Sequence, residues 1–398
     1  MRSELEDAGA TTSASPLPTV ATGRRTGGWA CSTDGAGCNL TCIPLGRSRA
    51  TVCSTRLGPT IAAGTGHPLI GPQAGRVLIA ASASLLLCLF SSPKFVEFLR
   101  SRSFGQHIRE ELTQHLEKAG TPTMGGIIVV LSFAVPYLCL STRDPASLGV
   151  FGAVLACGFL GFCDDYAKIS KRRSLGLRAR TKMAGMIAIS VMLWLIATRW
   201  AHVSTSVSLR PFNAHIDFGP SYIVLIYIVV AATTNAVNLT DGIDGLAGGC
   251  CAIAYLTYIG IAFITPGDHN LEIASGCMCG ACIGFLWFNS FPATVFMGDT
   301  GSLALGGGIA GLAIMTGTEL LLILIGGIFV IETLSVIIQV FSFRRFGRRV
   351  FKIAPIHHHF VMEAWTETQI VVRFWTVAAV CGAAGFTLYQ FSLHRHGH

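Results

Sequence analysis

Charged side chains are scarce in this chain, and their scarcity excludes an ordinary soluble protein. Only 13% of the 398 residues are charged, whereas 51% are hydrophobic and the mean hydropathy is +0.58. Soluble domains carry about 25% charged residues, so a lipid bilayer is the expected solvent for this chain. A net charge of +8 would suggest nucleic acid as the partner of a soluble protein. In a membrane protein it indicates basic cytoplasmic loops instead, and no nucleic-acid partner is expected.

No histidine or carboxylate accompanies the densest group of cysteines, which argues against a metal site there. Cys277, Cys279 and Cys282 are spaced like metal ligands, but no histidine or carboxylate stands beside them in their apolar segment. We therefore interpret them as small hydrophobic residues that pack inside a membrane domain. Four other cysteines lie in the N-terminal extension, with no pattern that indicates pairing.

Residues 1–75 lack a sustained apolar run, which excludes a packed core of their own. They are rich in Gly, Ser, Thr, Ala and Arg, so we predict a disordered extension. Their Ser- and Arg-rich composition with few acids weakly resembles an organellar transit peptide. A start codon assigned too far upstream would give the same composition, and the sequence does not separate these two origins.

Apolar stretches of nearly membrane-spanning length repeat from residue 76 onward. About 20 apolar residues cross the hydrocarbon as a helix, so we predict an all-α, polytopic membrane protein with about ten transmembrane helices. Glycines four residues apart, at Gly276, Gly280 and Gly284, and a second cluster over 306–311 predict close helix packing. The expected spans are 76–92, 124–142, 147–163, 183–200, 221–238, 243–264, 272–288, 301–316, 319–341 and 374–393.

The distribution of lysine and arginine predicts the orientation of these spans. The connections that follow the first, third and ninth spans hold most of the basic residues of the membrane domain. The even-numbered connections and the C-terminal tail hold only Arg143, Arg199, Arg210 and Arg395. Basic loops stay in the cytoplasm, so the odd-numbered connections are expected there.

The unusual polar residues fall at the same predicted membrane face. They are Asp164, Asp165, Asn238, Asp241, Asp244, Asn289, Asp299, His357, His358 and His359. Because the orientation was assigned from lysine and arginine alone, this convergence independently indicates one site. Five carboxylates gathered there repel each other, so basic side chains or a divalent cation must offset them. Hard oxygen ligands favour Mg²⁺ or Mn²⁺.

Each acidic motif also has a purely structural interpretation. Asp241 or Asp299 could cap the next helix, since aspartate is a favoured N-cap. The 164–165 pair could mark a helix end at the membrane interface. Asn238, Asp241 and Asp244 are spaced by three, so in a helical turn they would share one face, which a single cap does not explain.

Two other segments add candidate ligands. The histidines at 357–359 are open to three interpretations: structural zinc, a solvated basic loop, or contact with a phosphate or sugar and proton transfer. Lys118 and the 121–126 turn form either an interfacial anchor and helix start or a Gly-rich backbone that approaches a phosphate closely. At a membrane face, these parts suit transfer of a phosphorylated group from a soluble anionic donor to a lipid phosphate.

Five motifs in order, at 118–126, 164–168, 238–246, 296–302 and 355–360, resemble the phospho-N-acetylmuramoyl-pentapeptide-transferase family. The resemblance covers about 76–393 and implies a transmembrane glycosyl-1-phosphate transferase domain over 76–398. It implies Mg²⁺-dependent transfer of phospho-MurNAc-pentapeptide from UDP-MurNAc-pentapeptide to undecaprenyl phosphate, the first membrane step of peptidoglycan synthesis, which gives lipid I and UMP. It further implies a multi-pass protein of the bacterial inner membrane with a cytoplasmic site. A plastid envelope membrane is the alternative location, and a homodimer is compatible with the resemblance.

The same resemblance implies roles for individual residues. Asp299 binds Mg²⁺, and Asp164, Asp165, Asp299 and His357 are the expected catalytic residues. The expected donor-binding residues are Lys118, Thr123, Asn238, Asp241, Asp244, Asn289, His358 and His359. The chain departs from the family pattern at two places. In the loop at 106–115 the family usually has a Gly-Pro pair and one residue more. At position 361 the family usually has Glu, and this chain has Val361.

Two other function classes compete with this one. A related enzyme would transfer GlcNAc-1-phosphate to a polyprenyl phosphate, but the histidine triplet and the 121–126 turn favour the muramyl enzyme. A membrane transporter would place ionisable residues near the bilayer midplane. Here the acids lie at helix ends, and only Glu332 is clearly in the middle of a span.

Overall fold

The computed structural model describes residues 71–101, 121–171, 176–209, 214–265 and 270–396. Two predictions concern residues outside these ranges. The extension was predicted over 1–75, and its residues 1–70 are outside the described part of the chain. Lys118 is also outside it, in the segment 102–120.

Helices form nearly all of the described chain, and each predicted span overlaps a long helix. An all-α membrane architecture is therefore confirmed. The long helices are α1 (Pro72–Ser101), α2 (Gly126–Leu140), α3 (Pro145–Ser170), α4 (Ala179–Leu195, continued by a π-helical turn Ile196–Trp200), α5 (Tyr222–Thr240, after a 3₁₀ turn Gly219–Ser221), α6 (Leu246–Ile264), α7 (Leu271–Asn289), α8 (Gly298–Met315), α10 (Gly327–Phe346) and α12 (Glu367–His396). The short ones are α9 (Leu322–Ile325) and α11 (Ile356–Met362).

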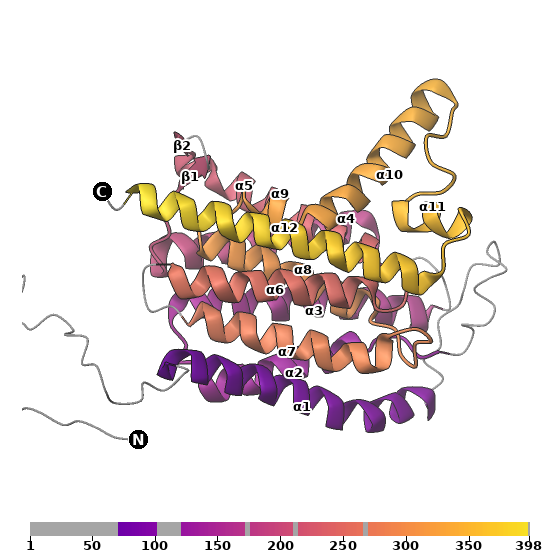
Figure 1. Cartoon of the computed structure of the whole chain (residues 1–398), viewed down its shortest axis with the longest axis horizontal. Helices are drawn as coiled ribbons and strands as arrows, with labels where there is room; N and C mark the ends of the chain where they lie inside the picture. Colours follow the sequence, from indigo (N-terminus) through magenta and orange to yellow (C-terminus); the bar gives the residue numbers. More distant parts are fainter. Residues whose placement is uncertain (1–70, 102–120, 172–175, 210–213, 266–269, 397–398) are drawn as a thin grey trace, which may run out of the picture. The chain divides into compact units, whose positions relative to one another are not determined.

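Eight helices in the described part of the chain are long and apolar enough to cross a bilayer. The spans predicted at 124–142 and 301–316 correspond to the two remaining long helices. Helix α2 is apolar but has only 15 residues, and every residue of α8 from Thr300 to Met315 is buried. Figure 1 shows the helices side by side, with α8 drawn inside the bundle. The core helix α8 is thus enclosed by the others.

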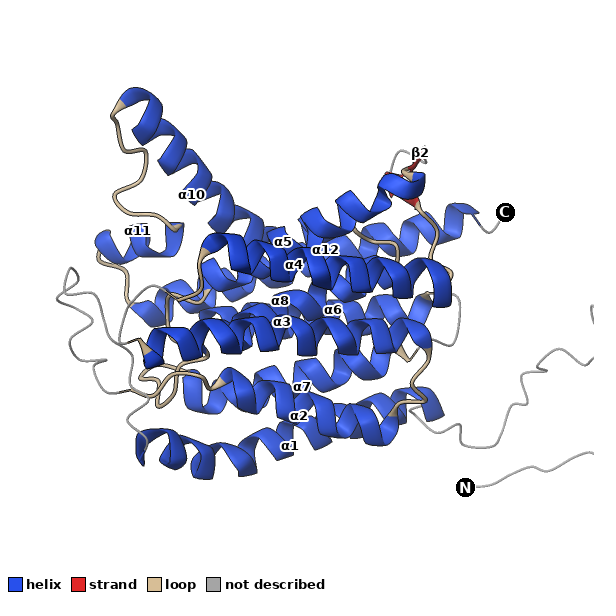
Figure 2. Cartoon of the chain, turned by 180° about the vertical axis from the view of Figure 1, so that it is seen from behind, coloured by secondary structure: helices blue, strands red, loops and turns tan. Residues whose placement is uncertain are grey.

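The chain from 319 to 362 differs from the prediction. The expected single span at 319–341 is broken into α9 and α10 at Gly326 and Gly327, because paired glycines weaken a helix and allow a sharp change of direction. Figures 1 and 2 show α10 leaving the bundle at an angle, and α11 contacts α10 near its start, where His357 lies against Glu332. The histidine segment, expected in a connection, forms helix α11 after Pro355.

A small antiparallel hairpin stands between α4 and α5. Strand β1 (Ser206–Leu209) pairs with β2 (Ala214–Asp217), with Val207 opposite Ile216. Serine alternates with apolar residues along β1, the period of a half-buried strand. The hairpin lies at the end of the bundle opposite α11 (Figure 1).

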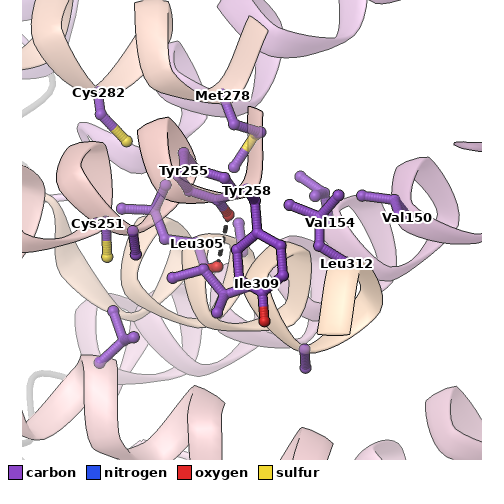
Figure 3. Close-up of a cluster of buried hydrophobic side chains, with 14 of the residues drawn as sticks. Val150, Val154, Cys251, Tyr255, Tyr258, Met278, Cys282, Leu305, Ile309 and Leu312 are labelled. Atoms are coloured by element: carbon purple, nitrogen blue, oxygen red, sulfur yellow. Dashed lines mark hydrogen bonds between the residues drawn. The ribbon is translucent and has the colours of Figure 1, made fainter. Parts of the chain in front are cut away.

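The core is formed where α3, α6, α7 and α8 meet. Figure 3 shows Tyr255 of α6 pointing at α8, where its hydroxyl donates a hydrogen bond of 2.7 Å to the Leu305 carbonyl. Cys282 and Cys251 are buried beside this tyrosine. Cys277, Cys279 and Cys282 are likewise buried in α7, the surroundings of small packing side chains.

Glycines allow these helices to approach each other closely, as predicted. A Cβ at Gly280 of α7 would lie 2.1 Å from the Ala81 carbonyl oxygen of α1. One at Gly307 of α8 would lie 2.5 Å from the Cys157 sulfur of α3. The glycine-rich faces of α7 and α8 therefore set the spacing of the bundle.

Candidate active site

The end of α3 and the start of α8 meet through two glycines. A Cβ at Gly161, one turn before Asp165, would lie 2.1 Å from the Asp299 carbonyl oxygen. Gly298 has a left-handed φ of +72°, and a Cβ there would lie 2.7 Å from an Asp165 carboxylate oxygen. A residue with a side chain at 298 would be both strained and obstructed. The sequence thus brings Asp165 onto the first turn of α8.

Asp165 caps α8 from a different helix. Its Oδ1 accepts the Asp299 N–H at 3.2 Å, and its Oδ2 accepts the Thr300 N–H at 2.9 Å and the Thr300 hydroxyl at 2.7 Å. These backbone donors belong to the first turn of a helix and have no partner within it. Asp299 is the second residue of α8, and its own side chain does not cap the helix. The structural alternative considered for Asp299, a cap of the next helix, is therefore filled by Asp165.

Asp164 and Asp299 are bridged by two lysines. The Lys168 ammonium lies 2.8 Å from Asp164 Oδ2 and 2.9 Å from Asp299 Oδ1. The Lys182 ammonium lies 2.7 Å from Asp299 Oδ2 and 3.6 Å from Asp164 Oδ1. Asp164 also accepts the Leu177 N–H at 2.9 Å. Lys168 also lies 3.5 Å from Asp165 Oδ1, but the shorter contacts of the two adjacent aspartates are with different partners, as expected for neighbours on a helix.

Three carboxylates form a candidate metal site. One oxygen from each of Asp164, Asp165 and Asp299 lies within 4.8 Å of the other two. The oxygens are hard ligands of the kind that Mg²⁺ prefers. Lys168 and Lys182 offset only two of the three negative charges, so the cluster as a whole attracts a cation. Both lysine side chains are partly exposed, at 32% and 22%, so they can move toward an anionic ligand.

Asn238 joins α5 to this cluster. Its side-chain amide donates to Asp299 Oδ1 at 3.1 Å and to the Ser302 hydroxyl at 2.8 Å. Asn238 therefore positions the carboxylate of Asp299 from the side opposite the lysines. The structure thus places Asn238 beside Asp299.

The shared helical face predicted for Asn238, Asp241 and Asp244 is not present. Helix α5 ends at Thr240, and the chain turns before α6 at Gly245, whose φ is +78°. Glycines at 242 and 245 favour that turn, so the three side chains separate. Asp241 lies at the end of α5, where burial and the charges of Asp299, Asp165 and Asp244 raise its pKa to about 7.

Asp244 and Asn289 hold the loop between α7 and α8. Asp244 accepts the Ala293 N–H at 3.0 Å. Asn289 accepts the Gly245 N–H at 3.1 Å and donates to the Val295 carbonyl at 3.0 Å. Both predicted donor-binding residues are buried and fasten the 241–245 turn to the 290–297 loop.

The 121–126 turn lies along the residues before α8. The Phe296 N–H donates to the Pro122 carbonyl at 2.9 Å, and the Gly125 N–H donates to the Phe296 carbonyl at 2.8 Å. Thr123 is buried, and a Cβ at Gly298 would lie 3.0 Å from its hydroxyl. Thr123 is therefore beside the carboxylate cluster.

The three histidines have different surroundings. His357 is fully buried, with its Nδ1 3.1 Å from Glu332 Oε1. His359 Nδ1 accepts the Lys352 N–H at 3.2 Å. A Cβ at Gly242 would lie 2.3 Å from His357 Nε2 and 3.3 Å from His358 Nε2. His357 and His358 thus contact the turn after α5. No metal cluster among the described residues includes a histidine.

Sequence reasoning missed three partners of this site. Lys182 was counted only as a basic residue for orientation, although it contacts two of the three carboxylates. Thr300 carries no signal beyond its place after Asp299. Glu332 was noticed as an ionisable residue inside a span, the signal that could have led to its histidine partner.

Comparisons with known proteins cover most of the chain. Residues 147–317 match the model of glycosyl transferase family 4, and residues 118–130 match phospho-N-acetylmuramoyl-pentapeptide-transferase signature 1. The chain is 46% identical over 325 residues to the phospho-N-acetylmuramoyl-pentapeptide-transferase of Rubrobacter xylanophilus, covering 80% of this chain and 98% of that protein. It is 42% identical over 329 residues to the enzyme of Desulfitobacterium hafniense, covering 79% and 98%. It is 46% identical over 310 residues to that of Halalkalibacterium halodurans, covering 76% and 94%.

Proposed function

This chain belongs to the phospho-N-acetylmuramoyl-pentapeptide-transferase family, and from that premise we propose that its carboxylate–lysine cluster is the catalytic centre. It is a transferase that catalyses the first membrane step of peptidoglycan synthesis. The donor is UDP-MurNAc-pentapeptide, the acceptor is undecaprenyl phosphate, and the products are lipid I and UMP. The observation that carries the assignment is the meeting of Asp164, Asp165 and Asp299 with Lys168 and Lys182 at one end of the bundle.

The reaction joins two anions, which sets what the site must do. An oxygen of the lipid phosphate bonds to the sugar-linked phosphorus of the donor, and the bond from that phosphorus to the bridging oxygen breaks as UMP leaves. Both reactants are anions that repel each other, and negative charge moves onto the oxygen of the leaving UMP, so cationic groups must offset these charges.

A divalent cation fits this site. The donor set is three carboxylates whose charges the lysines only partly balance. We infer that Mg²⁺ is held chiefly by Asp299, with Asp164 beside it, and that when bound it neutralises charge on the donor diphosphate. Asp165 is already engaged by three donors of α8, so its main work is to orient Asp299.

The other residues bind and align the substrates. Lys168 and Lys182 are placed to exchange their carboxylate partners for phosphate oxygens, since each is partly exposed. Asp164 orients the lipid phosphate. The turns at 121–126 and 241–245 line the space next to the cluster, and His358 and His359 contact the donor. Asp241 lies close enough to Asp299 and Asp165 that burial and their charges raise its pKa.

The location of the protein follows from its helices and its relatives. Eight candidate spans among the described residues indicate a multi-pass membrane protein, and its relatives are bacterial, which supports the plasma membrane. We propose that the cluster faces the cytoplasm, where the nucleotide donor is found. The basic residues of the odd-numbered connections support that orientation.

The decisive experiment is a reconstituted transfer assay. Purified full-length protein is mixed with UDP-MurNAc-pentapeptide, undecaprenyl phosphate and Mg²⁺, and UMP and lipid I are measured. We expect both products in equal amounts, and none when the lipid is omitted. A parallel reaction with UDP-GlcNAc as donor tests the related GlcNAc-1-phosphate transferase activity. Preference for UDP-GlcNAc, or UMP release without the lipid, would contradict the proposed function.

A further inference from the structure

The buried pair formed by Glu332 and His357 is separate from the carboxylate cluster. Glu332 lies on α10 and His357 on α11, and neither side chain is exposed to solvent. An isolated buried charge is costly, so such a residue is retained beside a partner. Their closest atoms, Nδ1 and Oε1, are 3.1 Å apart.

The contact leaves hydrogen-bonding capacity unused. Neither nitrogen of His357 nor either carboxylate oxygen of Glu332 has a well-directed hydrogen bond within the described structure. At 3.1 Å, Nδ1 and Oε1 therefore form a close polar contact whose N–H is not aligned with the oxygen. Buried polar atoms are rarely left in this state.

The other nitrogen of His357 points at the turn after α5. A Cβ built on Gly242 would lie 2.3 Å from Nε2. Gly242 stands between Asp241 and Asp244, next to the space proposed for the donor. With Nδ1 at Glu332, only Nε2 of this imidazole is directed to the site.

We propose that Glu332 is a positioning residue that acts through His357. Its carboxylate holds Nδ1 in the protonated form and sets the angle of the ring, so that Nε2 is presented to the donor beside Gly242. The inference rests on the proposed transferase function. A carboxylate beside one imidazole nitrogen fixes the tautomer and orientation of the ring, and at metal-bound histidines loss of such a partner lowers activity about 10- to 100-fold.

The chain offers a matched control for this idea. Glu319 is also buried, and it pairs with the hydroxyl of Tyr222. It lies beyond the C-terminal end of α8, whereas Asp299 is at the N-terminal end, and 18 helical residues extend about 27 Å. Glu319→Gln thus removes a buried charge of the same kind far from the site.

The test compares Glu332→Gln with Glu319→Gln in the reconstituted transfer assay, with thermal unfolding as the check on folding. We expect kcat/KM for UDP-MurNAc-pentapeptide to fall about 10- to 100-fold in Glu332→Gln and to change less than about twofold in Glu319→Gln. Equal losses in the two variants would overturn the proposal. If Glu332→Gln does not fold, Glu332→Asp keeps the charge but withdraws it from Nδ1, and a wild-type rate in that variant would overturn the proposal as well.

A double variant separates positioning from general support of the fold. If Glu332 acts only through the histidine, Glu332→Gln combined with His357→Asn should lose no more activity than His357→Asn alone. Losses that multiply would show that Glu332 acts independently of His357 and contradict the inference. An inactive wild-type protein would instead refute the transferase assignment itself, so the two failures are distinguishable.

Discussion

Changing Asp165 of α3 to asparagine should mainly lower stability, whereas changing the adjacent Asp164 to asparagine should mainly lower activity. Asp165 accepts three hydrogen bonds from the start of α8, whereas Asp164 contacts mainly the two lysines. Asp165→Asn keeps one acceptor oxygen but turns an NH₂ group toward a backbone N–H or the Thr300 hydroxyl. We expect Asp165→Asn to lose a rigid, buried helix cap and Asp164→Asn to lose an ion pair whose lysine partners can move.

The magnitude follows from the buried contacts. A hydrogen bond to a charged group contributes about 1.5–3 kcal/mol, and negative charge at a helix N-terminus adds about 0.5–1 kcal/mol. Asp165→Asn should therefore cost about 2–4 kcal/mol of stability. Asp164→Asn keeps the Leu177 N–H bond and loses attraction to partly exposed lysines, which is worth about 1 kcal/mol or less.

Thermal unfolding in detergent and steady-state rates measure these two effects separately. Asp165→Asn should lower the Tm by several degrees, while Asp164→Asn should unfold close to wild type yet lose at least about 100-fold in kcat. Thr300→Val is the matched control, since it removes one bond to Asp165 and leaves both backbone donors in place. Equal losses of stability in the two asparagine variants would refute the capping role of Asp165.

Three other outcomes are expected. Asp299→Asn should remove most turnover and leave a folded protein, because it deletes a charged oxygen ligand; a near-normal rate at low Mg²⁺ would show that Asp299 is not a metal ligand. A single cysteine at position 299, in a background without native cysteines, should resist a membrane-impermeant thiol reagent in intact cells, and labelling from outside would reverse the orientation. Deletion of residues 1–70 should leave the activity of the detergent-purified protein intact, since that segment lacks a core-forming pattern, and a folded but inactive truncation would contradict this expectation.

Much of the membrane bundle could be predicted because lipid imposes one simple pattern. Runs of about 20 apolar residues must be helices, and every predicted span overlaps a long helix in the structure. The break between α9 and α10 was harder to predict. Gly326 and Gly327 are the signal, but glycines also occur in straight helices of this chain, such as α7 and α8. Only tertiary contacts distinguish a glycine that bends a helix from one that packs against a neighbour.

The sequence could predict which residues gather at the site, but it could predict few of the contacts between them. Charge counting placed Asp164, Asp165 and Asp299 at one face, and they do form one cluster. The sequence could not show which acid serves the fold, because a cap supplied by another helix leaves no local pattern. Lys182 was overlooked for a related reason. It lies 117 residues from Asp299 along the chain, and no spacing rule reaches that far.

The contacts divide the polar residues of this face into two groups. Asp165, Asp244 and Asn289 are bound by backbone groups of other segments, which cannot move without loosening α8 or the 290–297 loop. Asp299, in contrast, is bound by lysine ammonium groups and a side-chain amide, all at the ends of side chains that can rotate. A cation or a phosphate can replace such partners at little cost to the fold. A site that must admit and release a charged substrate in every cycle needs groups of this second kind, held in place by groups of the first kind. The reacting charges should therefore gather at Asp299, Lys168 and Lys182, with Asp165 serving as their fixed support.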